Sequence, residues 1–222
     1  TGTILILDAV TGALIRELPR DAGRVLITTL LGEPTGKRLA AVELNLEAPI
    51  GAADRQPSGE SPARSPWRVV LWDLEHSEAA PKVLDLQTEG RRAAPPLAAL
   101  SADGKTLAAT TFGSTTIHLF AAEDGRAIRT IESPSEVRAL ALGGDDLLAA
   151  ASEGTIQLWN LFGAGGDAGG YVAGLSSSLS PVGRLQFNPR GTLLAVVSAS
   201  DFMRNEGATA SRVELWDAVT HR

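Results

Sequence analysis

The sequence contains no cysteine, and none of its apolar runs approaches the length of a membrane span. The absence of cysteine excludes disulfides, thiolate metal sites and cysteine nucleophiles, but it does not decide the compartment. The first residues, TGTILILDAV, lack the basic region and the cleavage site of a signal peptide. Because the chain begins with Thr1 and not with methionine, we expect it to be part of a longer polypeptide, and a removed signal peptide stays open.

Basic residues are also in the minority. Lys and Arg number 20 against 26 Asp and Glu, which gives a net charge of −6 and a pI near 5.1. Nucleic acids and anionic membranes require a basic surface, so this balance argues against both as general partners. The 222 residues, 44% of them hydrophobic and 21% charged, are typical of a globular chain that is long enough to bury a sizeable core.

A short apolar motif, often ending in Trp-Asp or Trp-Asn, returns five times along the chain. Each copy alternates with period two, which predicts a strand. The copies end at residues 8, 73, 121, 160 and 217, so the spacings are 65, 48, 39 and 57 residues. They read TILILD (3–8), RVVLWD (68–73), TTIHLFA (115–121), TIQLWN (155–160) and RVELWD (212–217).

Both faces of these predicted strands are apolar, which indicates sheets covered on both sides. Between the motifs lie further short apolar segments joined by the turn sequences SADGK, GGDD and NPRG, in which Gly, Asn and Asp favour hairpins. No segment of useful length shows helical periodicity. The sequence therefore predicts an all-β protein whose largest motif side chains pack between sheets: Leu7, Trp72, Phe120, Trp159 and Trp216.

The stretch LSADGKTLAATTFGSTTIHLFAAEDGRAIRTI (100–131) resembles the WD40 repeats of β-propellers, and the resemblance extends over essentially the whole chain. It implies four-stranded antiparallel blades with strands a, b, c and d, in which Trp-Asp closes strand c. The Trp ring would then pack between blades, and the Asp or Asn would bond the backbone of the c–d turn. The Gly-His pair that often precedes strand a in this family is missing, so we expect apolar packing to hold the blades together.

Strand counting divides the chain into a series of blades. Residues 1–18 supply strands c and d of a first blade, and three complete blades follow at 24–86, 96–131 and 136–175. A partial blade covers 182–217, and long insertions fall at 45–66 and 199–211. About four blades of this type are too few for a closed ring, so we expect a segment of a larger propeller.

The resemblance also implies a binding face, because the d–a and b–c loops of WD40 propellers emerge together and usually hold the partner. Both insertions fall in b–c loops of that face. Arg and large apolar side chains are favoured at interfaces, and loops on a rigid scaffold commonly carry function. The candidate protein-binding residues are Arg20, Arg55, Arg64, Trp67, Arg91, Arg92, Phe202, Met203 and Arg204.

Two alternatives to this binding role stay open at the sequence level. The insertion at 45–66 is rich in Pro, Gly, Ser and Ala, and it also reads as an inert solvated loop. Phe202 and Met203 could equally be buried against the base of their own loop.

The sequence shows no set of residues typical of a catalytic, cofactor or metal site. The segment GEPTGKR (32–38) has the wrong spacing for a phosphate-binding loop and is expected to be a hairpin turn. His76, His118 and His221 are too far apart for a metal motif, and no GxSxG elbow occurs. We therefore expect no catalytic residues, cofactor or metal.

The sequence therefore favours a non-enzymatic WD40-like interaction or scaffold module that binds a protein or a fused domain of its own chain. A cytoplasmic location is expected. The high Ala, Gly and Arg content without Cys suggests a bacterial source. In bacteria such propellers are often fused to kinases, NTPases or proteases.

The alternative is an exported propeller that binds a small ligand, or acts as an enzyme, at its central channel. The first residues of strand a, Arg24, Pro96, Val137 and Gly183, do not supply the repeated ionisable set that such a channel would need.

Overall fold

The structure, a computed structural model, describes residues 3–18, 24–47, 66–76, 79–84, 86, 95–144, 146–162, 170–198 and 212–221. All regular secondary structure in these residues is β-strand, and every strand pairs antiparallel with its neighbour in sequence within one of five sheets. The all-β class that the alternating motifs predict is therefore confirmed.

The sheets contain the strands in chain order. The first pairs β1 (Leu5–Leu7) with β2 (Leu14–Glu17). The second has β3 (Val25–Gly32), β4 (Arg38–Asn45), β5 (Trp67–Asp73) and β6 (Lys82–Leu84). The third has β7 (Pro96–Leu100), β8 (Thr106–Thr111), β9 (Thr116–Ala121) and β10 (Ala127–Glu132). The fourth has β11 (Ala139–Leu142), β12 (Leu147–Ala151), β13 (Thr155–Asn160) and β14 (Tyr171–Ser176), and the fifth has β15 (Val182–Phe187), β16 (Leu193–Ser198) and β17 (Val213–Asp217).

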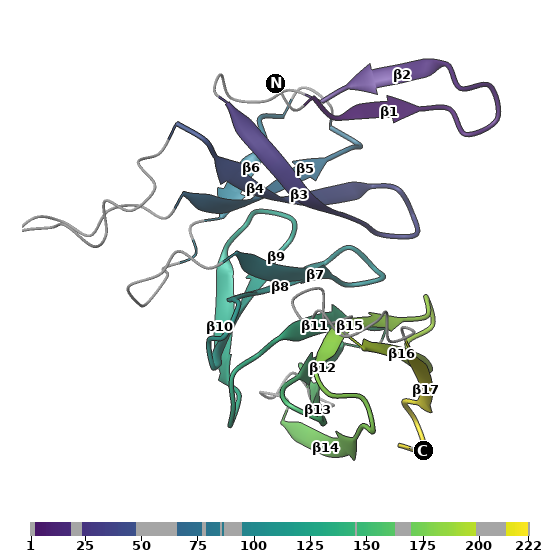
Figure 1. Cartoon of the computed structure of the whole chain (residues 1–222). Coiled ribbons are helices and arrows are strands. Elements are labelled where there is room, and N and C mark those ends of the chain that lie inside the picture. The colour runs from purple at the N-terminus through teal and green to yellow at the C-terminus, as the bar shows by residue number, and fades with distance from the viewer. Residues whose placement is uncertain are drawn as a thin grey trace, which may run out of the picture.

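The five sheets follow one another along an arc, like blades about a common centre (Figure 1). The first strand of each of the last four sheets (β3, β7, β11 and β15) lies innermost, and these four strands line one shared cavity. Three sheets have the four strands a, b, c and d that the repeats predict, and the described residues of the fifth sheet supply a, b and c.

The sheets are held together by apolar layers, and each layer is filled from two neighbouring sheets. The motif alternation explains these layers, because each strand c presents one face forward to the next sheet and the other backward to the preceding sheet. Val69 and Leu71 face forward onto the third sheet, whereas Trp72 faces backward onto the first. Trp72 is 2% exposed and Trp159 is 6% exposed, so the packing role expected for these rings is confirmed.

The Asp or Asn side chain at the end of the motif organises the turn that follows strand c. Oδ1 of Asp73 accepts hydrogen bonds from the backbone N–H groups of Glu75 and His76, at 2.9 and 3.2 Å. Asp8 and Asp217 each accept two such bonds, and Asn160 accepts one. A strand therefore ends in Trp-Asp because the ring fills the layer between sheets while its neighbour closes the turn.

A repeated basic side chain adds polar bonds between the sheets. Arg16, Lys82 and Arg129 lie on strand d of the first three sheets, each opposite the residue two places before the end of its motif. Arg16 donates from Nη1 to the carbonyl oxygen of Leu74 in the next sheet at 3.0 Å, and Arg129 donates from Nη2 to that of Leu161 at 2.5 Å.

The second sheet bonds the third through two basic side chains. Arg38 donates to the carbonyl oxygen of Ala122 at 3.0 Å, and Lys82 donates to that of Glu123. Leu74 and Leu161 each directly follow the end of a motif, so the same bond from strand d recurs at two sheet boundaries. At the boundary between the second and third sheets, the residue in that position is Ala122, whose bond comes from strand b, and Lys82 of strand d bonds the residue after it. The expectation that apolar packing alone holds the blades was therefore incomplete.

Candidate protein-binding face

The loop face of the molecule comprises the turns between strands b and c together with the turns between strand d and the next strand a. These turns share one end of the blades because the strands alternate in direction. The part that the structure describes consists mainly of residues 112–115, 133–138, 152–154 and 177–181. The turns at the opposite end of the blades, between a and b and between c and d, form the turn face.

An exposed ring and a guanidinium lie together on the loop face. Phe112 follows β8 and is 42% exposed. The guanidinium carbon of Arg138 lies 5.9 Å from the centroid of this ring, an arrangement that typically contributes about 0.5–1 kcal/mol at exposed sites. Nη2 of Arg138 also lies 3.1 Å from Oε1 of Glu153 and 3.8 Å from Oε2 of Glu136. The four residues form what we term the Phe112–Arg138 cluster.

Backbone bonds between two loops fix the position of the Phe112–Arg138 cluster. The N–H of Gly113 donates to the carbonyl of Val137 at 3.0 Å, and the N–H of Val137 donates to the carbonyl of Ser114 at 2.8 Å. Gly113 has a φ of +80°, which a residue with a Cβ rarely adopts, so glycine is needed for this turn. Val137 is fully buried and anchors the second loop in the core.

Hydroxyl groups beneath the cluster join the same loops. Oγ of Ser135 donates to Oγ of Ser152 at 2.8 Å. Oγ of Ser133 lies 2.8 Å from the carbonyl of Ser135 and 3.3 Å from Oε1 of Gln157. Ser133, Ser152 and Gln157 are all buried. The loops that carry the cluster are therefore already ordered by hydrogen bonds. Less conformational entropy would be lost when a partner binds them.

A carboxylate fixes the neighbouring loop at 177–181. Oε2 of Glu214, on β17, accepts hydrogen bonds from Oγ of Ser177 at 2.7 Å and from Nε1 of Trp216 at 3.2 Å, while Oε1 accepts from Ser178. These bonds favour the ionised form, so they lower the pKa of Glu214, chiefly through the side chain of Ser178. The loop between the fourth and fifth sheets is therefore tied to the fifth sheet.

Eight of the nine predicted binding residues lie outside the described residues: Arg20, Arg55, Arg64, Arg91, Arg92, Phe202, Met203 and Arg204. Trp67 is described. It is the first residue of β5, opposite Leu44 on β4, and it is partly buried against the apolar layer between the second and third sheets. Trp67 therefore packs partly into the core, and its contact with a partner stays a prediction.

Sequence reasoning missed Phe112 and Arg138. The available signal was an aromatic residue directly before glycine in a b–c turn (TTFGST), where a buried strand has already ended. An arginine just before the next strand a (SEVRAL) was the second half of the signal. Neither segment stands out in length, whereas the two long insertions do.

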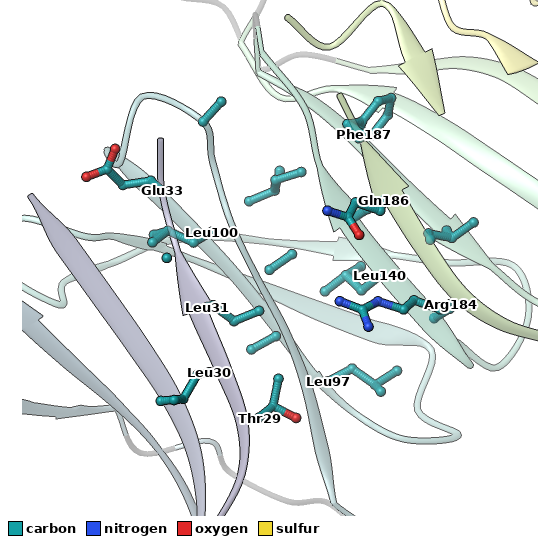
Figure 2. Close-up of a pocket in the computed structure, with 18 of the residues that line it drawn as sticks. Thr29, Leu30, Leu31, Glu33, Leu97, Leu100, Leu140, Arg184, Gln186 and Phe187 are labelled. Carbon is teal, nitrogen blue, oxygen red and sulfur yellow. The ribbon is translucent and has the colours of Figure 1, made fainter. Parts of the chain in front are cut away.

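A second candidate site is the cavity of about 690 Å³ along the four innermost strands, which Figure 2 shows with its lining side chains. Most of its lining is apolar or backbone, and its two charged residues are Glu33 and Arg184. Arg184 is exposed and extends from β15 toward the Leu140 side of the cavity (Figure 2).

Glu33 is committed to its own turn. Its carboxylate accepts hydrogen bonds from the backbone N–H groups of Thr35, Lys37 and Arg38. Burial acts to raise the pKa of Glu33, but these bonds outweigh it, and the pKa lies below the ordinary value. A carboxylate held in this way is a poor general base, so the described residues that line the cavity offer no pair of free acid and base groups.

The described residues offer no metal site and no membrane-spanning helix. The described residues contain no group of three or more His, Cys, Asp or Glu placed to hold a metal ion. They also contain no helix of the length and apolar character that a membrane crossing requires.

No family model and no curated protein sequence matches this chain. Solved structures do match it. The WD40 repeats of RRP9 align over 91% of this chain and 51% of their own, with 16% identity and a TM-score of 0.57. A chain from the complex of KlAtg21 with the coiled coil of AgAtg16 aligns over 99% of this chain and 60% of its own, with 18% identity and a TM-score of 0.63.

Hydrazine synthase of Kuenenia stuttgartiensis also matches. It aligns over 87% of this chain and 46% of its own, with 14% identity and a TM-score of 0.55. This chain thus spans roughly half of the length of the solved structures that it matches. At these identities the likeness establishes the fold, which is that of WD40 β-propellers, and carries no activity with it.

Proposed function

We propose that this chain, which has the WD40 β-propeller fold, is a non-enzymatic interaction module that binds a protein or another domain of its own polypeptide through its loop face. The observation that carries the proposal is the Phe112–Arg138 cluster. It presents an exposed ring and a guanidinium on backbone that is already fixed by bonds between two loops.

The chemistry of the cluster suits a protein partner. Aromatic and Arg side chains are enriched among the residues that dominate binding energy at protein interfaces. Glu136 and Glu153 hold Arg138 in place and leave the cluster with mixed charge, which does not favour a polyanion such as a nucleic acid. The net charge of −6 points the same way.

The predicted residues of the insertions would extend this face. The insertions at 45–66 and 199–211 fall between strands b and c, as the turn of Phe112 does, so in this proposal all three contribute to the same face. In this proposal Trp67 and the eight other predicted residues surround the Phe112–Arg138 cluster. The KlAtg21 complex supports a protein partner by analogy, because a chain of this fold is there found together with a coiled coil.

The second candidate function is ligand binding or catalysis at the central cavity. Two observations favour it: the exposed Arg184 in a cavity of about 690 Å³, and the enzyme hydrazine synthase among the matching structures. Substituting Arg184→Ala separates the two functions, since it would abolish ligand binding in the cavity and leave partner binding at the loop face unchanged.

The test compares matched variants of the chain. The partner captured by the wild-type chain from its source cells is purified, and its affinity is then measured by calorimetry. Phe112→Ser and Arg138→Glu should each weaken binding by about 2 kcal/mol or more, the threshold for interface hot spots. Deleting residues 54–66 together with Arg91→Glu and Arg92→Glu tests whether the predicted residues around the cluster contribute to binding.

The matched controls lie on the turn face. Val10, which is 94% exposed, is changed to Ser, and the exposed Arg126 is changed to Glu. These substitutions repeat the same chemistry at the other end of the blades and should leave the affinity unchanged. Equal binding by all loop-face variants, with circular dichroism showing that they are folded, would refute the loop-face proposal.

A further inference from the structure

Strand d, the outermost strand of a blade, differs in charge from one sheet to the next. β2 carries Arg16 and Glu17, β6 carries Lys82, and β10 carries Arg129 and Glu132. β14, with the sequence YVAGLS, contains no charged residue. Charged side chains are one of the means by which natural sheets prevent a further chain from pairing with an outermost strand. Among the d strands that the structure describes, β14 alone lacks them.

The outer edge of β14 has backbone groups that point away from its own sheet. The fourth sheet has all four strands, and β14 is its outermost one (Figure 1). The N–H of Ser177 donates to the carbonyl of Gly154 on the β13 side at 3.0 Å, and alternate residues of an antiparallel strand bond to the same neighbour. The N–H and carbonyl groups of Gly174 and Ser176 therefore point outward, where the described residues supply no pairing strand.

The corresponding position in the third sheet holds a charge. Glu132 of β10 and Ser176 of β14 occupy the same place, because each lies opposite a Thr that is five residues before the end of its motif. In both sheets the next residue, Ser133 or Ser177, donates its N–H to the backbone just before strand c. The outward position is thus a carboxylate in β10 and a small neutral side chain in β14.

An exposed aromatic ring lies along the same strand. Tyr171 is 61% exposed, and its ring meets that of Trp159 edge-on, with the centroids 6.2 Å apart and the planes at 77°. A Cβ at position 174 would lie 2.7 Å from the Tyr171 hydroxyl, so the absence of a side chain at Gly174 allows the ring to lie along β14. Val172 is 44% exposed. An added strand would therefore find apolar side chains beside outward-pointing backbone groups.

We propose that β14 accepts an extended segment of a partner polypeptide along its outer edge, as a fifth strand of the fourth sheet. The backbone groups of Gly174 and Ser176 pair with the segment, which is how extended peptides add to exposed sheet edges. The segment is uncharged where it covers Tyr171 and Val172, because a charge buried there would find no partner on β14. One of its apolar side chains packs on the Tyr171 ring. This contact is independent of the loop-face proposal.

The dimensions of the edge favour a short segment over a second copy of the chain. Six residues of a strand span about 20 Å and a sheet is about 10 Å thick, so pairing along β14 covers roughly 200 Å². A stable interface between two proteins buries about 800 Å² on each partner. The edge of β14 is therefore too small to hold two copies together by itself, whereas an extended segment uses its whole length.

Titration of the purified 222-residue chain with a synthetic strand tests the proposal. The probe is the acetylated and amidated peptide TIQLWN, the sequence of β13, which is uncharged and pairs with β14 along the inner edge. Binding is followed by amide hydrogen exchange, resolved for single residues by NMR. The peptide should slow exchange at Gly174 and Ser176, whose N–H groups gain acceptors. Exchange at Thr130 and Glu132, the corresponding residues of β10, should not change.

Matched variants separate backbone pairing from unspecific apolar contact. Ser176→Pro removes one outward N–H and should weaken peptide binding by about two- to tenfold, the value of one backbone hydrogen bond. Proline is tolerated on edge strands where its N–H would face solvent, so the variant should fold, which circular dichroism checks. Ser176→Ala keeps the N–H and should bind like the wild type. Glu132→Pro makes the backbone change on β10 and should leave the affinity unchanged.

A modified peptide tests the same point without changing the protein. N-methylation of its Gln and its Leu blocks one donor on each edge of the peptide strand and keeps every side chain. This peptide should bind more weakly than the unmodified one, again by about two- to tenfold, whichever edge it presents to β14.

Three results would overturn the proposal. The first is the absence of saturable binding up to the solubility limit of the peptide. The second is equal binding of the unmodified and the N-methylated peptide, which would show that the backbone groups do not pair. The third is a wild-type chain that dimerises in sedimentation velocity and becomes monomeric with Ser176→Pro, which would assign the edge to a second copy.

Discussion

Arg129 on the outer strand of the third sheet donates a hydrogen bond to the backbone carbonyl of Leu161 in the fourth sheet, at 2.5 Å. Leu161 is fully buried and directly follows the end of its motif. The bond therefore joins two blades at the point where a strand ends and its turn begins. Arg16 on the first sheet makes the same bond to Leu74 in the second sheet.

Replacing Arg129 with Ala should destabilise the protein. A hydrogen bond from a charged donor contributes about 1.5–3 kcal/mol. We expect a loss in unfolding free energy of that size, measured by denaturant titration. Arg126→Ala, at an exposed position on the same blade, should lose less than about 0.5 kcal/mol, the range of ordinary surface substitutions. Equal losses in the two variants would contradict the proposed role of the bond.

The boundary between the fourth and fifth sheets lacks this cation, and restoring it should stabilise the protein. Ala173 on β14 pairs with Leu158, two places before the motif end, where the first three sheets have Arg16, Lys82 and Arg129. Ala173→Arg would place a donor near the carbonyl of Ala218. We expect a gain of about 0.5–1.5 kcal/mol, and Ala173→Met, similar in length but uncharged, should not reproduce it. No gain over Ala173→Met would show that register alone does not create the bond.

Acid should destabilise the fold partly through Glu33. The pKa of Glu33 is lower in the folded chain than its ordinary value of 4.5, because hydrogen bonds outweigh burial. A group with a lowered pKa contributes stability above its unfolded pKa, and this contribution is lost as the pH falls through the folded pKa. Unfolding free energy should therefore decrease below about pH 4.5.

Glu33→Gln tests the assignment of this acid sensitivity. The variant should be less stable than the wild type at pH 7 and should lose less stability between pH 6 and about pH 3.5, because one linked carboxylate is gone. Glu17→Gln, which makes the same substitution at an exposed position on an outer strand, serves as the control. Parallel profiles for the wild type and Glu33→Gln would rule out Glu33 as a source of acid sensitivity.

The turn after strand c should depend on its Asp. Oδ1 of Asp73 accepts two backbone N–H bonds, and its Oδ2 lies 3.0 Å from Nδ1 of His76. Asp73→Ala would leave those donors without this acceptor, and we expect a loss of about 1–3 kcal/mol. Asp73→Asn keeps Oδ1 as an acceptor, as Asn160 does in its own turn, and should recover most of the stability. A thermal unfolding series of the two variants checks this, and equal losses would contradict it.

The blade architecture was readable from the sequence because it depends on local patterns. Alternation placed Val69 and Leu71 on one face and Trp72 on the other, and Asp73 beside them marked the turn. The carbonyl bonds of Arg16 and Arg129 were missed because their acceptors are backbone atoms 58 and 32 residues away. Only the docking of neighbouring blades brings these groups together.

The sequence indicated which turns form the loop face, but it did not indicate Phe112 and Arg138. The strand order indicated which turns share an end, and the insertions drew attention to residues such as Arg91 and Arg204, whose role stays a prediction. Phe112 and Arg138 are 26 positions apart, and short loops carry them both. They meet through the backbone bonds of Gly113 and Val137, which no composition or spacing reveals.

Hydrogen exchange of the chain with and without its bound partner tests the loop-face assignment most directly. Binding should slow exchange at residues 112–115, 133–138 and 152–154 on the loop face. Exchange in the turns at 8–13, 122–126 and 217–221 on the turn face should not change. Protection confined to the turn face, or to the innermost strands that line the central cavity, would contradict the proposed function.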